Sequence, residues 1–293
     1  MSLLPTIPAY ETDALPEGVQ HISQAILAQP KDEVWIVATG PLTNIAVLFR
    51  EFPEVLHHVR GVSIMGGAIG EVAVPAFSPS SSPASSAAAG LATRTAPFSS
   101  APPHRADGKG NWTPHAEFNI FADPEAAAYV LNTLQEHKKP AILIPLDLTH
   151  QVRGTAAVQS LLFPSSSSSS TQGKSEYRSE SISKIRQMFK QILLYFSDTY
   201  AVHSGITDGP PLHDPLAVFA VVEPGAFEDG GGERWQVNVD VSDGERAGET
   251  VATLLRQDNT GGGVRIPRSV NLDRFWRSVD DALAVAEKKV AGG

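Results

Sequence analysis

Continuous apolar runs and helically spaced apolar residues alternate along the first half of the chain. The runs at 34–39, 61–67 and 140–149 have strand length and few polar interruptions, which is typical of strands buried on both faces. Helical spacing follows at 45–59 and at 123–134, where Asp and then Pro open the segment. This alternation predicts a parallel sheet covered by helices.

The second half continues the alternation with longer helices. Segment 181–205 predicts a long amphipathic helix. Its apolar residues at helical spacing are Ile185, Met188, Phe189, Ile192, Leu193, Phe196 and Tyr200. An alternating strand is predicted at 234–241, then a Gly-containing turn with the segment 249–255, and a closing helix at 272–290. We therefore expect an α/β fold with an open, mostly parallel sheet flanked by helices.

Two stretches rich in Ser, Pro and Ala interrupt this pattern, at about 76–109 and 164–177. They contain few apolar anchors, so they offer little to offset the entropy of ordering. We expect disordered insertions within a single domain that spans 1–293 rather than domain boundaries.

Composition narrows the class of protein. The 293 residues include no Cys, which excludes disulfides, thiolate metal sites and Cys nucleophiles. The formal net charge of −9 and the lack of a basic stripe argue against a nucleic-acid surface. No apolar run has transmembrane length and no signal peptide is evident, so we expect no membrane partner and a cytoplasmic location.

The candidate site residues lie where the predicted strands end or in the loops just after them. These places hold Thr39, Met65, the segment 111–119, and the pair His213 and Asp214. In open α/β sheets, ligands bind outside the carboxyl ends of the strands. The motifs GxGxxG after a strand, GxxxxGK[ST], GxSxG and HExxH are absent, which removes the usual dinucleotide, P-loop, serine-hydrolase and zincin interpretations.

The segment 111–119 carries Asn111, Glu117 and Asn119. In an extended segment, the spacing of Glu117 and Asn119 points both side chains to one side. One carboxylate and two amides facing a common space suit a polyhydroxylated ligand. The alternative is ordinary turn chemistry beside Gly and Pro, which this segment alone favours.

The pair His213 and Asp214 opens an apolar run after a Gly-Pro-Pro loop. Asp214 suits a hard cation, Ca²⁺ or Mg²⁺ rather than zinc, or it N-caps the following helix with Pro215 at the first helical position. His213 is a candidate general acid with a pKa near neutrality, or a structural residue. Asp147 is a site residue or a loop cap, and His150 reads as a surface or cap residue.

Five segments resemble the inosine-uridine-preferring nucleoside hydrolase family, in the family's order. They are 34–70, 110–131, 141–152, 208–227 and 270–283. The resemblance implies the family's Rossmann-like fold and a metal-dependent hydrolysis of the N-glycosidic bond of nucleosides, giving ribose and a free purine or pyrimidine. A nucleoside substrate and a homo-oligomer are implied as partners.

The resemblance also implies a role for each matching residue. Asp214 is a Ca²⁺ ligand, and Thr39 is a second ligand through its backbone carbonyl. His213 is the catalytic residue, placed beside the base as proton donor. Substrate binding falls to two further sets: Asn111, Glu117 and Asn119 hold the ribose hydroxyls, and Met65 and Phe118 line the sugar pocket. Tyr200 and His203 are expected to face the base.

One departure stands out against this resemblance. The family opens with a motif of the form DxDxGxDD, whereas the first acidic residues here are Glu11, Asp13 and Glu17. One carboxylate and one carbonyl fall short of the roughly six to eight oxygens that Ca²⁺ takes. We therefore expect a chain that lacks the family's first strands and is inactive or weakly active. The alternatives are a non-catalytic ribose-binding or interaction protein on the same scaffold, or an unrelated α/β binding protein in which His213 and Asp214 only cap a helix.

Overall fold

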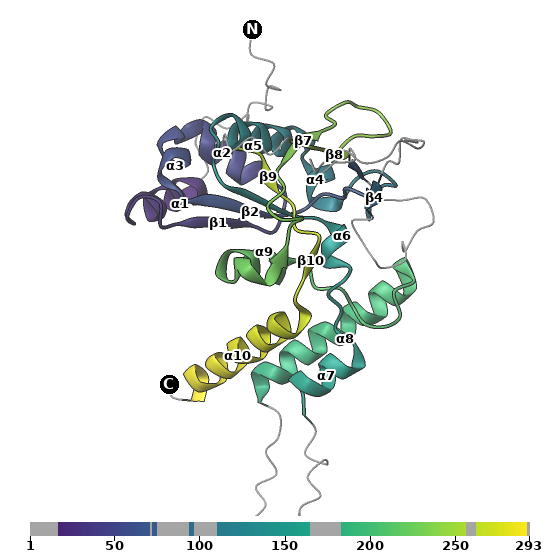
Figure 1. The fold of residues 1–293 in the computed structure, drawn as a ribbon. Helices are drawn as coiled ribbons and strands as arrows, with labels where there is room; N and C mark the ends of the chain where they lie inside the picture. The colour runs from purple at the N-terminus through teal and green to yellow at the C-terminus, as the bar shows by residue number, and fades with distance from the viewer. Residues whose placement is uncertain are drawn as a thin grey trace, which may run out of the picture.

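A six-stranded sheet forms the centre of the molecule, in the order β1-β2-β5-β9-β7-β8 (Figure 1). Its strands are β1 (Trp35–Ala38), β2 (Gly61–Met65), β5 (Ala141–Ile144), β9 (Val264–Arg265), β7 (Trp235–Val239) and β8 (Thr250–Leu254). The first four run parallel, and β7 is antiparallel to both β9 and β8. The predicted open, mostly parallel sheet is confirmed. The computed structural model describes residues 17–70, 72–74, 94–96, 110–164, 183–255 and 262–291.

Helices of the first half cover one face of the sheet. They are α1 (Glu17–Leu27), α2 (Thr43–Glu51), α3 (Pro53–His58) and α5 (Pro124–Glu136). Pro53 divides the helix expected at 45–59 into α2 and α3, since its ring cannot sit inside a helix. Asp123 caps α5 as predicted, with its carboxylate accepting the N–H of Ala126 at 3.0 Å. A buried cluster of aliphatic side chains fills the space between these helices and the sheet.

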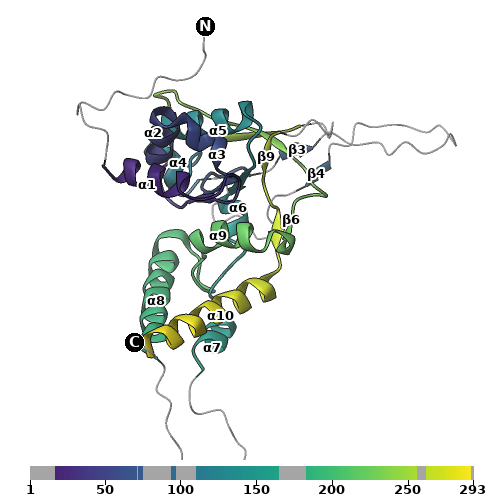
Figure 2. The same ribbon diagram turned by 90° about the vertical axis from the view of Figure 1, so that its left-hand side faces the viewer.

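The opposite face is covered by α9 (Asp214–Val222), which buries Leu216, Ala217 and Ala220. The Ser63 hydroxyl of β2 donates to the Ala217 carbonyl at 2.8 Å and ties α9 to the sheet. Further from the sheet lie α7 (Ala156–Leu162), α8 (Lys184–Ser204) and α10 (Leu272–Ala291), as Figures 1 and 2 show.

Shorter elements complete the described chain. They are β3 (Val72–Val74), β4 (Arg94–Ala96), α4 (Phe118–Ala122), α6 (Leu146–Thr149), the 3₁₀ turn Pro224–Ala226, β6 (Phe227–Glu228) and β10 (Ser269–Val270). None of the helices in this described part is both long and apolar enough to cross a membrane.

Two sequence expectations differ from the structure. The run 140–149 is a strand only to Ile144; Pro145, which has no N–H for the ladder, ends it and α6 follows. The apolar face expected on α8 is only partly covered: Leu193 is buried and Phe189 packs against the core, whereas Met188 is 57% and Phe196 is 47% exposed. Helical spacing shows which side chains share a face, but not whether another element covers that face.

The two Ser- and Pro-rich segments fall almost wholly outside the described residues. Of 76–109, only residues 94–96 are described, and they pair with β3 as the antiparallel strand β4. Of 164–177, only residue 164 is described. Disorder of these insertions, and the single domain they would interrupt, stay predictions.

Candidate functional site

Glu117 lies just beyond the end of β2 and is 2% exposed. It is the N-cap of α4, and its Oε2 accepts the N–H of Ile120 at 3.2 Å and of Gly67 at 3.0 Å. Burial raises the pKa of this carboxyl; backbone N–H groups oppose the rise, and the charge of Asp214 adds to it. The capping role confirms the turn-chemistry interpretation in part, and the coupling to Asp214 goes beyond it.

Asn119 does not lie in an extended segment with Glu117, as the sequence suggested, but in the first turn of α4. The helix still buries both side chains. The Asn119 Nδ2 group donates to the Met65 carbonyl at 3.1 Å and lies 3.4 Å from the Met65 sulfur. Glu117 and Asn119 therefore both hold the backbone where β2 leaves the sheet, and Met65 lies with them.

Asn111 and Phe118 form the outer part of this segment. The Asn111 Oδ1 atom accepts the Phe118 N–H at 2.9 Å, and the Asn111 residue itself is exposed. The Phe118 ring is 46% exposed and meets the Trp112 ring edge-on, with centroids 5.3 Å apart. The structure thus places Asn111 and Phe118 at the rim, beside the buried pair.

Asp147 caps the loop that follows β2. Its two carboxylate oxygens accept the N–H groups of Ile69 and Gly70, each at 2.8 Å. Within the same loop Gly67 has φ of +81°, and a Cβ there would approach the Thr250 hydroxyl to 3.1 Å, so glycine is required. Asp147 therefore fixes the loop that presents Gly67 to Glu117.

His213 sits between two hydroxyl groups. Its Nδ1 lies 2.7 Å from the Thr149 Oγ1, and its Nε2 lies 2.7 Å from the Tyr200 hydroxyl. The His150 ring, expected at the surface, meets it edge-on at 5.6 Å. Burial lowers the pKa of His213 to about 4, so the expectation of a pKa near neutrality is wrong and the imidazole is neutral at pH 7.

Asp214 is the first residue of α9, and His213 is the N-cap, with no capping bond from its side chain. The alternative that Asp214 serves as the N-cap is therefore wrong. Partial burial raises the pKa of Asp214 itself. Burial is also the main cause of the raised pKa of Tyr200, to which the charges of Asp214 and then Glu117 contribute. Hydrogen bonds connect the Glu117 loop to the start of α9 through α6: Gly67 bonds to Glu117 and to the Leu146 N–H, and Thr149 bonds to His213.

A family model described as inosine-uridine preferring nucleoside hydrolase matches residues 4–277. The chain belongs to this family. A uridine nucleosidase of Saccharomyces cerevisiae is 27% identical over 98% of this chain and 71% of its own length. A probable ribonucleoside hydrolase of Dictyostelium discoideum is 29% identical over 87% of this chain and 58% of its own length.

Solved structures agree on the fold of this nucleoside hydrolase family member. A purine-preferring ribonucleoside hydrolase from Gardnerella vaginalis has a TM-score of 0.62 at 21% identity, covering 96% of this chain and 69% of that chain. A plant nucleoside hydrolase has a TM-score of 0.62 at 22% identity, covering 93% and 69%.

Thr39 follows β1 directly and is exposed. Because Ala38 pairs with Ile64, Thr39 stands level with Met65 at the edge that carries the site. A nucleoside hydrolase of this family is generally metal-dependent, yet among the described residues no three His, Cys, Asp or Glu side chains are grouped closely enough to hold an ion. Asp214 and the Thr39 carbonyl do not make a calcium site by themselves.

The sequence analysis did not single out Thr149 and placed His150 at the surface, yet both lie beside His213 in this candidate site. Both follow the strand Ala141–Ile144 within a few residues, at the same carboxyl edge as the other site residues. A position just after a strand end could have identified both as candidate site residues. Because the strand was expected to run through Thr149, they were not recognised as lying after its end.

Proposed function

We propose that this site binds a ribonucleoside and hydrolyses its N-glycosidic bond to ribose and a free base, with uridine and inosine as the substrates to try first. Membership of the nucleoside hydrolase family supports the reaction class. The observation that carries the proposal is a set of hydrogen bonds that joins the Glu117 loop to the start of α9. Glu117 accepts the Gly67 N–H, and the Gly67 carbonyl accepts the Leu146 N–H at 2.9 Å. Thr149 of the same short helix, α6, bonds to His213.

The ribose hydroxyls are assigned to Asn111, Glu117 and Asn119, with Met65 and Phe118 beside the sugar. A carboxylate that is buried and held by backbone N–H groups is pre-positioned, so a bound diol meets it without reorganisation. Negative charge there favours the oxocarbenium character that develops on the sugar as the bond to the base breaks.

His213, acting with Tyr200, is the proposed source of the proton for the leaving base. The Thr149 hydroxyl donates to the Leu146 carbonyl at 3.4 Å, so it accepts from Nδ1–H, and the Tyr200 hydroxyl then donates to Nε2. His213, whose pKa of about 4 keeps it neutral at pH 7, must first take a proton from solvent at Nε2, which negative charge developing on a departing base would favour. That proton passes to the Tyr200 oxygen as the Tyr200 O–H gives its own proton to the base.

Calcium is the proposed ion, with Asp214 and the Thr39 carbonyl as its ligands from this chain. The described residues supply no further grouped ligand, so no step of the reaction is assigned to the ion. The same observation favours the second candidate function, ribose binding without turnover on the same scaffold. A cytoplasmic location and a homo-oligomer stay predictions of the sequence.

The test uses the whole chain with uridine and inosine, with added CaCl₂ or with a chelator, and measures both base release by chromatography and nucleoside binding by calorimetry. Base release that exceeds a Glu117→Ala control supports the hydrolase. Saturable binding without base release supports the ribose-binding alternative. Absence of both binding and turnover contradicts the assignment of the site.

A further inference from the structure

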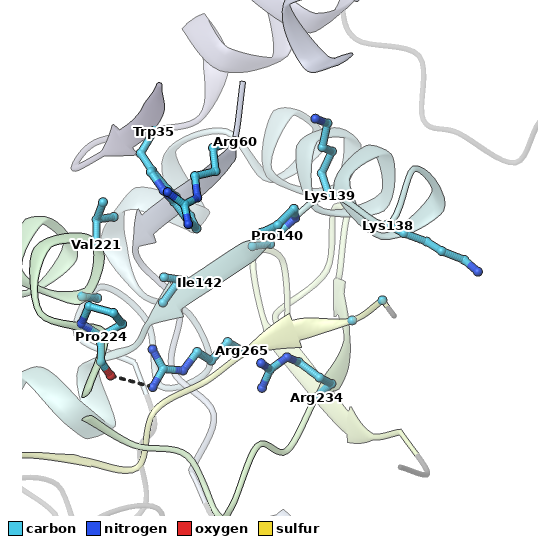
Figure 3. Close-up of a pocket in the computed structure, with 14 residues that line it drawn as sticks. Trp35, Arg60, Lys138, Lys139, Pro140, Ile142, Val221, Pro224, Arg234 and Arg265 are labelled. Carbon is cyan, nitrogen blue, oxygen red and sulfur yellow. Dashed lines mark hydrogen bonds between the residues drawn. The ribbon is translucent and has the colours of Figure 1, made fainter. Parts of the chain in front are cut away.

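A cavity of about 730 Å³ opens at the amino ends of the parallel strands, the edge opposite the site described above (Figure 3). Residues at or just before the starts of β1, β2 and β5 line it, together with β9 and the last turn of α9. The cavity and the candidate active site are therefore separated by the length of the strands.

Basic side chains from four segments line this cavity. They are Arg60, Lys138, Lys139, Arg234 and Arg265. Such a concentration of positive charge is unexpected in a chain whose formal net charge is −9. Figure 3 shows Arg60 beside Trp35 on one side of the cavity, and Arg234 and Arg265 on the other, with Ile142 between them. Lys138 and Lys139 point away in the same view, so the arginines carry the argument.

Acidic groups do not balance these arginines. Asp229 accepts from Arg265 at 2.7 Å and from Arg234 at 3.4 Å, so one carboxylate serves two guanidinium groups. Burial acts to raise the pKa of Asp229, but these arginines and the Gly232 N–H outweigh it and hold the pKa below its usual value. Asp229 thus stays ionised and offsets one of the two charges.

Arg60 has no such partner. Its residue is exposed, and within the described chain its guanidinium makes neither an ion pair nor a hydrogen bond. The Arg265 Nη2 group donates to the carbonyl oxygens of Pro224 and Phe227, at 3.0 and 3.4 Å, just beyond the end of α9. The Arg60 guanidinium, and those N–H groups of Arg234 that have no acceptor among the described residues, are therefore available to donate hydrogen bonds to an anion.

The floor between the arginines is apolar. Trp35, Ile142, Val221 and Pro224 contribute to it. The Trp35 ring packs on Gly61, where an added Cβ would lie 2.6 Å from the ring, so the indole is held in place. A cavity with a cationic rim and a fixed aromatic wall suits a ligand that carries both a phosphate group and a ring.

We propose that this cavity binds the diphosphate group of a nucleoside diphosphate, with its base against Trp35. Guanidinium groups match phosphate oxygens in a two-pronged geometry, and two arginines on opposite sides of the floor suit a group with two phosphates. The site is separate from nucleoside hydrolysis and does not depend on it.

The probes are ADP and inorganic pyrophosphate, titrated into the whole chain by isothermal calorimetry at low salt. We expect both to bind, with ADP binding more tightly because its base adds contact with Trp35, and with quenching of indole fluorescence by ADP alone. Equal affinity for the two probes would overturn the part of the proposal that concerns the base. No measurable binding of either probe would overturn all of it.

Variants tie the binding to the cavity. Arg60→Gln should weaken both probes by about tenfold, the effect of losing one hydrogen bond to a charged group, and Arg60→Lys should restore part of the affinity. Arg277→Gln is the matched control, since Arg277 is an exposed arginine on α10 outside the cavity. Equal weakening in Arg277→Gln, or none in Arg60→Gln, would show general charge attraction or binding elsewhere, and would refute the site.

Discussion

Replacing Asp147 tests whether the loop after β2 is held from α6. The Asp147 carboxylate accepts the N–H groups of Ile69 and Gly70, both at 2.8 Å. Ile69 is 2% exposed and belongs to the core, so the loop cannot move into solvent to find new partners. Asp147→Asn keeps one acceptor oxygen and turns the other position into a donor that faces an N–H group.

The expected losses follow from counting these bonds. A hydrogen bond to a charged group contributes about 1.5–3 kcal/mol, so Asp147→Asn should lower the free energy of unfolding by about 2 kcal/mol. Asp147→Ala removes both acceptors and should cost about 4 kcal/mol. Because the loop also presents Gly67 to Glu117, both variants should weaken nucleoside binding although neither alters a residue assigned to the ribose.

Urea unfolding followed by circular dichroism measures the two losses. Asp198→Asn is the matched control, because Asp198 is exposed on α8, and it should change the free energy of unfolding by less than about 0.5 kcal/mol. If Asp147→Asn lay within that same range, or if Asn and Ala cost the same, the carboxylate would not be holding the two N–H groups separately.

Three further predictions concern the imidazole network and the packing of β2. Tyr200→Phe leaves the Nε2 atom of His213 without its hydroxyl donor and should lower the free energy of unfolding in urea by about 1 kcal/mol; an unchanged value would contradict the bond. Because the pKa of His213 falls from 6.5 to about 4 on folding, the unfolded state binds more protons between those values. Stability should therefore decrease as pH falls from 7 to 5, by about 2 kcal/mol more than in His213→Gln; parallel curves would contradict the lowered pKa. Gly61→Ala should cost about 3 kcal/mol, since its Cβ would lie 2.5 Å from the Pro140 carbonyl, whereas Gly18→Ala, with nothing within 4 Å, should be neutral or stabilising in the same urea assay.

The central strands were predictable because burial on both faces leaves a signature within each strand. Runs at 34–39 and 61–67 contain mostly apolar residues, and the structure forms β1 and β2 within them. The rule that ligand-binding residues follow strand ends in open α/β sheets also predicts Met65, Glu117 and Asp214 as site candidates from the sequence.

What escaped prediction depends on contacts between distant parts of the chain. The two hydrogen bonds of His213 reach 13 and 64 residues away, and its lowered pKa follows from burial, which the local sequence does not show. The exposed part of the apolar face of α8 could not be predicted for the same reason, because residue spacing within a helix does not show which elements pack against it. The basic cavity joins Arg60 and Arg234 from separate segments, each of which looks unremarkable alone.

The site residues at the end of β2 combine a structural and a chemical task. Beyond Met65 the chain turns away from the sheet, so the Met65 carbonyl and the Gly67 N–H are satisfied by Asn119 and Glu117 instead. Asn119 uses its Nδ2 group in this way, and its Oδ1 atom has no partner within the described residues, which leaves an acceptor for a ligand hydroxyl. Replacement of Asn119 by Asp would place a carboxylate oxygen, rather than a donor, against the Met65 carbonyl. The amide suits this position because it donates to the backbone with one atom and leaves the other able to accept from a ligand hydroxyl.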